Sequence, residues 1–235
     1  YSHENMRRLK DLQPRARFVL YNWDAITTHD YTPYLGYFDE VFTFDPVDAK
    51  AHGLTHLPLF CLRRFQDLKD RAETPRSVYF VGNIVNPARY RAVQKFRGYC
   101  RDNGIQFRYF LSTTVHGYTQ MLKDGLRPTD VTLRQIAPER FLDMVERSAA
   151  VFDFSNHRQS GYTMRTIENL CAGKKLITNN PLIRGEDFYS GDRIHLFDDL
   201  DFDGVVGFLD RPLTTPDNTF SQFHVQNFVK TLMKL

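Results

Sequence analysis

The segment "SVYFVGNIVNPARYRAVQKFRGYCRDNGIQFRYFL", residues 77–111, contains a complete strand–helix–strand pattern. It begins with an apolar run, Ser77–Asn83, that has the length and composition of a buried strand. Residues Ala88–Gly104 then follow a helical pattern, and Asn103-Gly104 is a favourable helix end. A second strand is predicted at Gln106–Leu111. Because two strands joined by a long helix lie parallel with a right-handed crossover, the segment predicts a βαβ unit.

The same alternation of strands and helices continues to the end of the chain. Further strands are predicted at Val131–Ile136, Ala150–Ser155, Lys175–Thr178 and Arg193–Phe197, with helices at Pro138–Ala149 and Thr163–Ala172. Residues 75–235 therefore predict a doubly wound α/β domain with a Rossmann-type parallel sheet. In such sheets ligands bind beyond the carboxyl ends of the strands, near helix N-termini.

Residues 1–70 predict a second, smaller α/β unit. Its helix is expected at Asn5–Gln13 and its strands at Arg17–Trp23, Glu40–Asp45 and Thr55–Phe60. A charged connector that ends in Pro75 separates the two units. Because the chain begins at Tyr1 within a predicted helix, we expect this first unit to be incomplete.

Composition narrows the class of protein. The chain has 235 residues and is 42% hydrophobic, enough for a sizeable core. A net charge of +3 is too small to indicate a nucleic-acid partner. Three cysteines without a close pair argue against a disulfide framework and against a zinc site, so we expect a cytoplasmic protein. No apolar run approaches the roughly 18 residues that a membrane span needs.

The segment "SGYTMRTIENLCAGKKLITNN", residues 160–180, has features of a nucleotide site. Gly161 allows close approach of the backbone to a ligand, and the N–H groups at the following helix start attract phosphate. Ser160 and Thr163 are able to cap that helix or to bind phosphate oxygens. Glu168 is a suitable acceptor for two ribose hydroxyls. The residues alone leave an equal alternative, in which the hydroxyls only cap the helix and Glu168 is solvated.

A longer segment, residues 134–180, resembles the carboxy-terminal half of GT-B glycosyltransferases. The family's E-G-F-G loop corresponds to Ser160–Thr163, which includes Tyr162, and its E-A-x-A-x-G helix motif corresponds to Glu168–Gly173. The resemblance implies that Glu168 holds the ribose of the donor. Ser160 stands where the family has a glutamate that contacts the donor sugar, so this departure leaves the sugar and the stereochemistry open.

Two signatures resemble a bacterial group of lipopolysaccharide and capsule glycosyltransferases more closely. One is "Q-[ST]-G-x-T-M-R-T-I-E", matched at Gln159–Glu168, and the other is "W-D … F-D-x-V-F-[ST]-F-D-P-x-D", matched at Trp23–Asp48. The resemblance implies a GT-B-like fold, with the donor bound by residues 75–235 and the acceptor by the first unit.

Other polar residues complete the expected donor site. Asn83 and Arg89 follow the first strand of the second unit, where the family places basic residues that neutralise the donor pyrophosphate, and Arg91 is a further candidate. Arginine suits this role because its planar fork binds phosphate bidentately. The alternative is that both arginines lie on a solvated helix face. Arg165 is also placed to reach phosphate, or else to pair with Glu168 or solvent.

The loop after the first strand, "YNWDAITTHDY", supplies the candidate catalytic residue. Asp24 is placed to act as a general base toward an acceptor hydroxyl, with His29 and Asp30 as alternates. An aspartate at a strand end is, alternatively, a turn residue. His157 is expected only as a contact in the donor loop. The acidic run Asp198–Gly204 lacks the spacing of an EF-hand, so it predicts a solvated loop.

These features predict a glycosyltransferase that moves a sugar from a nucleotide-sugar donor to a hydroxyl of a growing surface glycan, as in lipopolysaccharide, O-antigen or capsule. We expect no metal and no cofactor, because helix N-termini and basic side chains stabilise the leaving diphosphate. The expected partners are a nucleotide sugar and a glycan or lipid-linked acceptor, with peripheral contact with the inner membrane left open. Two alternatives remain: a nucleotide-sugar epimerase of the same architecture, and a non-catalytic nucleotide-sugar-binding subunit.

Overall fold

The chain forms two compact units in the computed structural model. The structure describes residues 2–68, 72, 74–154, 161–214 and 217–234. As far as its residues are described, unit 1 consists of Tyr1–Leu62, Asn156–Ile167 and Gln222–Leu235, and unit 2 of Arg63–Ser155 and Glu168–Ser221. The sequence suggests one boundary near residues 70–75, whereas the structure groups two later segments with the first unit.

Unit 1 is built on a small parallel sheet. Its strands lie in the order β1 (Val19–Asn22), β2 (Glu40–Thr43) and β3 (Thr55–His56). The helical segments of this unit are α1 (His3–Leu12), η1 (Thr32–Tyr37), α2 (Pro46–His52) and α9 (Val225–Met233).

Helix α2 has clear local causes at both ends. The carboxylate of Asp45 accepts hydrogen bonds from the N–H groups of Val47 (2.9 Å) and Asp48 (3.2 Å), and Pro46 occupies the first turn. Gly53 ends the helix in the left-handed region with φ of 64°, which glycine adopts at little cost. The helix therefore begins directly after β2, at the carboxyl edge of the sheet.

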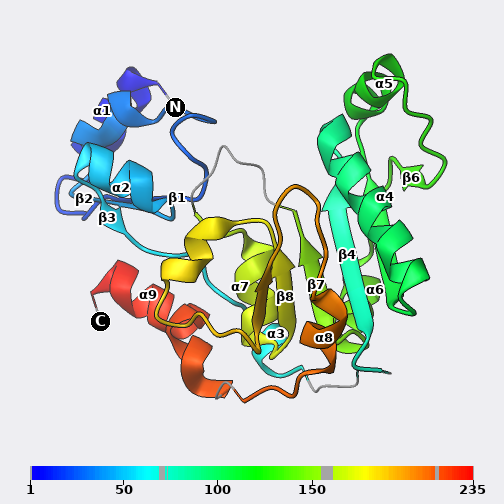
Figure 1. Cartoon of the computed structure of the whole chain (residues 1–235). Coiled ribbons are helices and arrows are strands. Elements are labelled where there is room, and N and C mark those ends of the chain that lie inside the picture. Colours follow the sequence, from blue (N-terminus) through cyan, green and yellow to red (C-terminus); the bar gives the residue numbers. More distant parts are fainter. Residues whose placement is uncertain (1, 69–71, 73, 155–160, 215–216, 235) are drawn as a thin grey trace. The chain divides into compact units, whose positions relative to one another are not determined.

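Unit 2 contains a six-stranded parallel sheet (Figure 1) in the order β6-β5-β4-β7-β8-β9. The strands are β4 (Ser77–Asn83), β5 (Gln106–Ser112), β6 (Val131–Thr132), β7 (Ala150–Asp153), β8 (Lys175–Thr178) and β9 (Ile194–Leu196). The helical segments are α3 (Arg63–Gln66), α4 (Pro87–Asp102), α5 (Val115–Lys123), α6 (Pro138–Glu146), α7 (Met164–Cys171), η2 (Pro181–Gly185), α8 (Val205–Asp210) and η3 (Asp217–Phe223), of which α7 and η3 continue into unit 1. Counted along the chain, this is the 3-2-1-4-5-6 order of the dinucleotide-binding fold, and the order reverses between β4 and β7.

Aromatic side chains fill the core of unit 2. The rings of Phe96 on α4 and Phe152 on β7 stack with centroids 4.1 Å apart, and neither side chain is exposed. Phe197, which follows β9, and Phe202 also pack against Phe152. Such pairs stabilise the core beyond their buried area, so α4 is held firmly against the sheet that carries the site.

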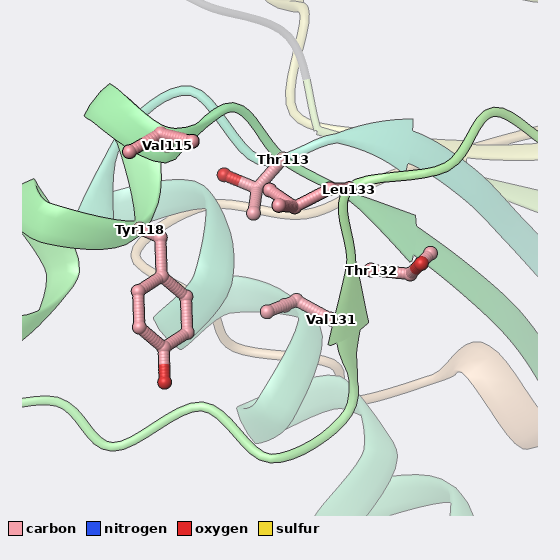
Figure 2. Close-up of a pocket in the computed structure, with 6 residues that line it drawn as sticks. All are labelled: Thr113, Val115, Tyr118, Val131, Thr132 and Leu133. Carbon is pink, nitrogen blue, oxygen red and sulfur yellow. The ribbon is translucent and has the colours of Figure 1, made fainter.

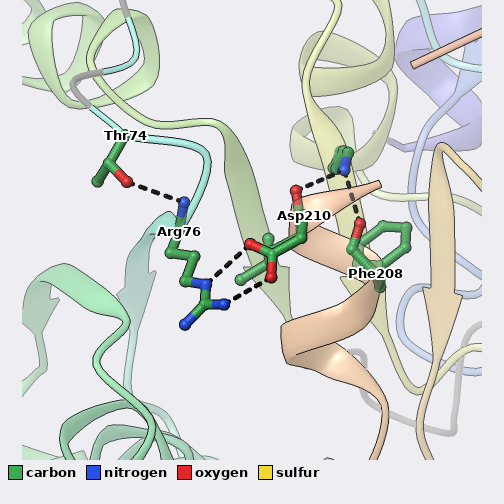
Figure 3. Close-up of polar contacts among 6 residues, drawn as sticks. Thr74, Arg76, Phe208 and Asp210 are labelled. Atoms are coloured by element: carbon green, nitrogen blue, oxygen red, sulfur yellow. Dashed lines mark hydrogen bonds and ion pairs between the residues drawn. The ribbon is translucent and has the colours of Figure 1, made fainter. Parts of the chain in front are cut away.

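A buried lysine and an ion pair fasten helix α8. Lys175, which begins β8, donates from Nζ to the carbonyl oxygens of Phe208 (2.6 Å), Leu209 (2.8 Å) and Arg211 (2.5 Å). Arg76, just before β4, binds both carboxylate oxygens of Asp210 (Figure 3), at 2.8 and 2.6 Å. A cation at a helix C-terminus satisfies its last carbonyls, so these contacts end α8 and fix it to the sheet.

The prediction of a parallel α/β fold is confirmed, and several predicted elements match closely. β4 and β8 have the predicted bounds, and α1, α4, α6, α7 and β5 begin and end within a few residues of them. Two predicted strands are much shorter than expected: only Thr55–His56 and Val131–Thr132 pair. Helices α2, α5, α8 and α9 were not predicted. Among the residues that the structure describes, no helix is long and apolar enough to cross a membrane.

Candidate functional site

Arg89 lies at the point where the strand order of unit 2 reverses. Asn86 caps α4 by accepting from the N–H of Arg89 at 2.9 Å, so Arg89 occupies the first turn of the helix. Its guanidinium donates to the carbonyl of Asn83 at 3.1 Å and to the carbonyl of Phe154 at 2.9 Å. Asn83 ends β4 and Phe154 follows β7, so the guanidinium bridges the two strand ends that form the switch point. A half-buried cation is thereby held where doubly wound sheets bind their ligands.

A groove lies beside this point, at the carboxyl ends of β4, β5 and β6. One part is an apolar pocket of about 250 Å³ lined by Thr113, Val115, Tyr118, Val131, Thr132 and Leu133. Figure 2 shows the side chain of Val131 of β6 directed toward the ring of Tyr118 of α5.

The second part of the groove is more polar. It has a similar volume, about 250 Å³, and is lined by Asn83, Ser112, Thr113, Thr114, Val115, Leu133 and Gln135. The two pockets share three lining residues, so they adjoin each other, and together they are called the groove, with an apolar end and a polar end that reaches the strand end at Asn83.

Close packing at the start of α5 shapes one wall of the groove. Thr113 donates from Oγ1 to the carbonyl of Ile84 at 2.8 Å, and Thr114 caps α5 by accepting from the N–H of Gly117 at 3.0 Å. A Cβ at Gly117 would lie 2.6 Å from the Thr113 hydroxyl and 2.9 Å from the Ile84 carbonyl. Only glycine therefore allows α5 to approach β4 so closely.

Asp130 fixes the opposite wall of the groove, which is formed by the very short strand β6 and the residue after it. Its carboxylate accepts hydrogen bonds from Tyr90 (2.9 Å), Gln94 (2.8 Å) and Arg97 (3.4 Å), which lie on one face of α4. Burial, and the hydrogen bond to Asp130, raise the pKa of Tyr90, so its hydroxyl remains a donor. Because Asp130 directly precedes Val131, these bonds set the position of the apolar end of the groove.

Helix α7 carries Glu168. Thr163 caps the helix by accepting from the N–H of Thr166 at 3.2 Å, as the sequence suggests. Glu168 is buried, with 8% of its surface exposed, so the alternative of a solvated carboxylate is wrong. The next residue, Asn169, accepts from the hydroxyl of Tyr79 on β4 at 2.9 Å, which ties α7 to the sheet. The role of Glu168 toward ribose stays a prediction.

Gly161 is engaged within the protein. It is buried, and its N–H donates to Oδ2 of Asp45 at 3.3 Å. A Cβ at this position would lie 2.5 Å from ring carbons of Phe44. The glycine is therefore required for packing against Phe44 and Asp45, a reason that differs from the predicted close approach to a ligand.

The remaining donor-side candidates are placed as follows. Tyr162 and Arg165 are half-buried at the start of α7. Arg91 forms an ion pair with Asp124 at the end of α5, which agrees with the alternative of an exposed helix face. Ser160 and His157 lie outside the described residues.

The candidate base and its alternates lie in the loop after β1, and all three are exposed. The backbone carbonyl of Asp24 accepts from the side chain of Asn22 at 2.7 Å, and its role as a base stays a prediction. Asp30 accepts from the hydroxyl (2.6 Å) and the N–H (2.9 Å) of Thr32, and these bonds lower the pKa of Asp30. A lowered pKa makes a weaker base, so Asp30 is better described as a turn residue.

Acidic residues outside the groove form turns. In the run Asp198–Gly204, the carboxylates of Asp198 and Asp201 accept from the N–H groups of Asp199 and Asp203, both at 3.0 Å. Within the described part of the chain, no group of three or more His, Cys, Asp or Glu side chains is arranged to hold a metal ion.

Apart from Asn83, sequence reasoning missed the residues that line the groove. Helix α5 was not predicted, because "VHGYTQMLK" contains glycine and β-branched residues that disfavour helix. Thr114 could have indicated the start of this helix, because threonine is a favourable N-cap residue and its hydroxyl accepts from the N–H three residues later.

Comparison with known proteins places the fold. No protein-family model and no curated protein matches the chain. Among solved structures, it is similar to the pneumococcal O-GlcNAc transferase GtfA, in complex with UDP and GlcNAc, with a TM-score of 0.55 and 11% identity. The chain has a GT-B-like fold.

Two other structures are similar at lower scores. They are TarM, with a TM-score of 0.43 and 11% identity over 84% of this chain and 41% of TarM, and a putative UDP-N-acetylglucosamine 2-epimerase from Listeria monocytogenes, with a TM-score of 0.44 and 8% identity over 99% of this chain and 79% of the epimerase. The GtfA match covers 88% of this chain and 47% of GtfA, so the chain spans less than half the length of either GtfA or TarM.

Proposed function

We propose that unit 2 binds a nucleotide sugar and that the chain is part of a glycosyltransferase that acts on a surface glycan. The observation that carries this proposal is the guanidinium of Arg89, held by the carbonyls of Asn83 and Phe154 at the switch point of the sheet. A cation fixed at this point is placed for the diphosphate of a ligand bound across the carboxyl ends of the strands. The GT-B-like fold supports the same assignment.

The groove provides space for one end of the ligand. Its polar end, at Asn83 and Ser112, lies nearer the switch point than its apolar end, between Tyr118 and Val131. Glu168 is proposed to accept hydrogen bonds from the two ribose hydroxyls, as the resemblance implies. Ser160, Tyr162, Thr163 and Arg165 are proposed as further contacts to the phosphates and the sugar.

In the proposed reaction the bond between the anomeric carbon and the diphosphate oxygen breaks, and a bond to an acceptor hydroxyl oxygen forms. Negative charge grows on the leaving diphosphate, and Arg89 and the N-terminus of α4 stabilise it without a metal. Asp24 is proposed to take the proton of the acceptor hydroxyl. We propose a lipopolysaccharide, O-antigen or capsule acceptor, transfer in the cytoplasm, and peripheral contact with the inner membrane.

A thermal-shift screen with UDP, GDP, CMP and dTDP sugars tests the proposal. A ligand at a hundred times its Kd stabilises the folded state by about 2.7 kcal/mol, which raises the melting temperature measurably. We expect one nucleotide class to do so. A chain that responds to none of these nucleotides would contradict the proposal. Turnover of the nucleotide sugar without an acceptor would favour the epimerase instead.

A further inference from the structure

The single tryptophan of the chain is exposed at a strand end. Trp23 directly follows β1, and 55% of its surface is accessible. Isolated exposed apolar side chains are common on protein surfaces, so exposure alone indicates nothing. Tryptophan, however, has a large apolar surface, so leaving it in water forgoes much stabilisation from burial.

The loop that carries Trp23 is fixed on both sides of it. The side chain of Asn22 donates to the carbonyl of Asp24 at 2.7 Å, directly around the tryptophan. Ala25 is buried, and the N–H of Ile26 donates to the carboxylate of Asp48 on α2 at 2.8 Å. These contacts hold the backbone on either side of the indole, which stays in water although its loop is packed. Because the backbone that carries the indole is already held in place, less entropy is lost when a partner covers the ring.

Polar and apolar groups gather at the same edge of the sheet. β1 and β2 are parallel neighbours with Asn22 opposite Thr43, so the segments that follow them meet at one edge. Val47, in the first turn of α2, is 60% exposed. Asp24 and His29, in the loop after β1, are exposed as well. An aromatic ring, an aliphatic side chain, a carboxylate and an imidazole therefore occupy this edge.

This combination matches the chemistry of a saccharide. A pyranose ring has a face of C–H groups, which packs on the electron-rich face of an indole, and a rim of hydroxyls, which bond to carboxylate and imidazole. We propose that Trp23 is the platform of a saccharide-binding subsite in unit 1, with Asp24 and His29 as hydroxyl partners. The exposed carboxylates of Asp24 and Asp30 in the same loop disfavour an anionic lipid surface. That the saccharide is the acceptor glycan rests on the proposed function.

Fluorescence tests the subsite directly, because Trp23 is the only indole in the chain. The protein is titrated with glucose, galactose, N-acetylglucosamine and lactose, and the emission of the indole is recorded. We expect a saturable blue shift with at least one of these sugars and none with UDP, since a stacked ring is less exposed to water. Unchanged emission with all four sugars would overturn the proposal. A blue shift seen only with vesicles of anionic phospholipid would overturn it as well.

Substitutions separate this subsite from the nucleotide site. Calorimetry with the responding sugar is expected to show a loss of affinity on the order of tenfold in Trp23→Ala, and a smaller loss in Trp23→Phe, which keeps an aromatic face. Nucleotide affinity should be the same in both variants as in the parent chain. Equal sugar affinity in Trp23→Ala would refute the platform and leave the nucleotide site standing. Sugar binding without any nucleotide binding would instead refute the proposed function alone.

Discussion

The carboxylate of Asp45 accepts a hydrogen bond from the N–H of Gly161 at 3.3 Å, although the two residues are 116 positions apart. The same carboxylate caps α2 through its other oxygen, and its side chain is buried. The first residue belongs to the "F-T-F-D-P-x-D" signature and the second to "Q-S-G-Y-T-M-R-T-I-E". The two sequence signatures thus meet within unit 1, where one helps to position the other.

Substitution of Gly161 by alanine is expected to destabilise the protein by about 1–3 kcal/mol, because the added Cβ would overlap the ring of Phe44. Urea unfolding measures the change. Gly36→Ala is a matched control in the same unit, since nothing lies within 4 Å of its Cβ position. Equal stability of the two variants would contradict the packing described here.

Arg89→Ala is expected to weaken nucleotide binding by about 1.5–3 kcal/mol, because a charge-assisted contact to phosphate is lost. Arg91→Ala is the control, since it removes a cation two residues away that pairs with Asp124. Calorimetry of both variants with the nucleotide that stabilises the parent chain gives the comparison, and urea unfolding monitors the lost carbonyl contacts of Arg89. If the two variants bind equally well, Arg89 holds only the strand ends.

Lys175→Met is expected to lower the free energy of unfolding by about 1–3 kcal/mol at pH 7, because three carbonyls at the end of α8 lose their donor. Lys123→Met, at the exposed end of α5, should change stability little. Chemical denaturation of the two variants measures both changes. Equal stability of the two would show that Lys175 does not stabilise the end of α8.

The same lysine predicts a pH dependence. Burial lowers the pKa of Lys175 to about 8, below the 10.5 of an exposed lysine. Between these values the unfolded chain binds more protons at this position than the folded one, so stability rises with pH there. The free energy of unfolding of the parent chain should therefore increase relative to Lys175→Met from pH 8 to 10.5. Parallel curves for the two proteins would show that burial does not shift this group.

The local sequence was sufficient to predict elements that are determined by their own residues. The apolar run Ser77–Asn83 and the β-branched "KLIT" run predict β4 and β8 with their observed bounds. The capping pattern of Asp45-Pro46, with Gly53 at the far end, was available for α2 but lay next to a strand signal. Helix α5 depends on contact with β4 through Gly117, which no local pattern shows.

The sequence predicted several residues of the candidate site, but it did not predict the contacts that these residues make. The sequence singled out Asn83, Arg89 and Glu168, and the structure places the first two together at the switch point and Glu168 buried on α7. It could not show that Arg89 binds the carbonyl after β7, or that Asp45 occupies the N–H of Gly161. Those contacts join residues far apart in the chain, and they form only when the sheets assemble.

Arg89 carries the proposal that this chain binds a nucleotide sugar, and the ribose contact proposed for Glu168 gives its most direct test. In Glu168→Gln the side chain keeps its size and one acceptor oxygen but loses its charge, so the fold should persist. Calorimetric titration with the preferred nucleotide should show binding weaker by on the order of 1–3 kcal/mol than in the parent chain. Glu139→Gln, an exposed position at the start of α6, should bind as the parent does. Equal affinity of Glu168→Gln and the parent chain would contradict the account.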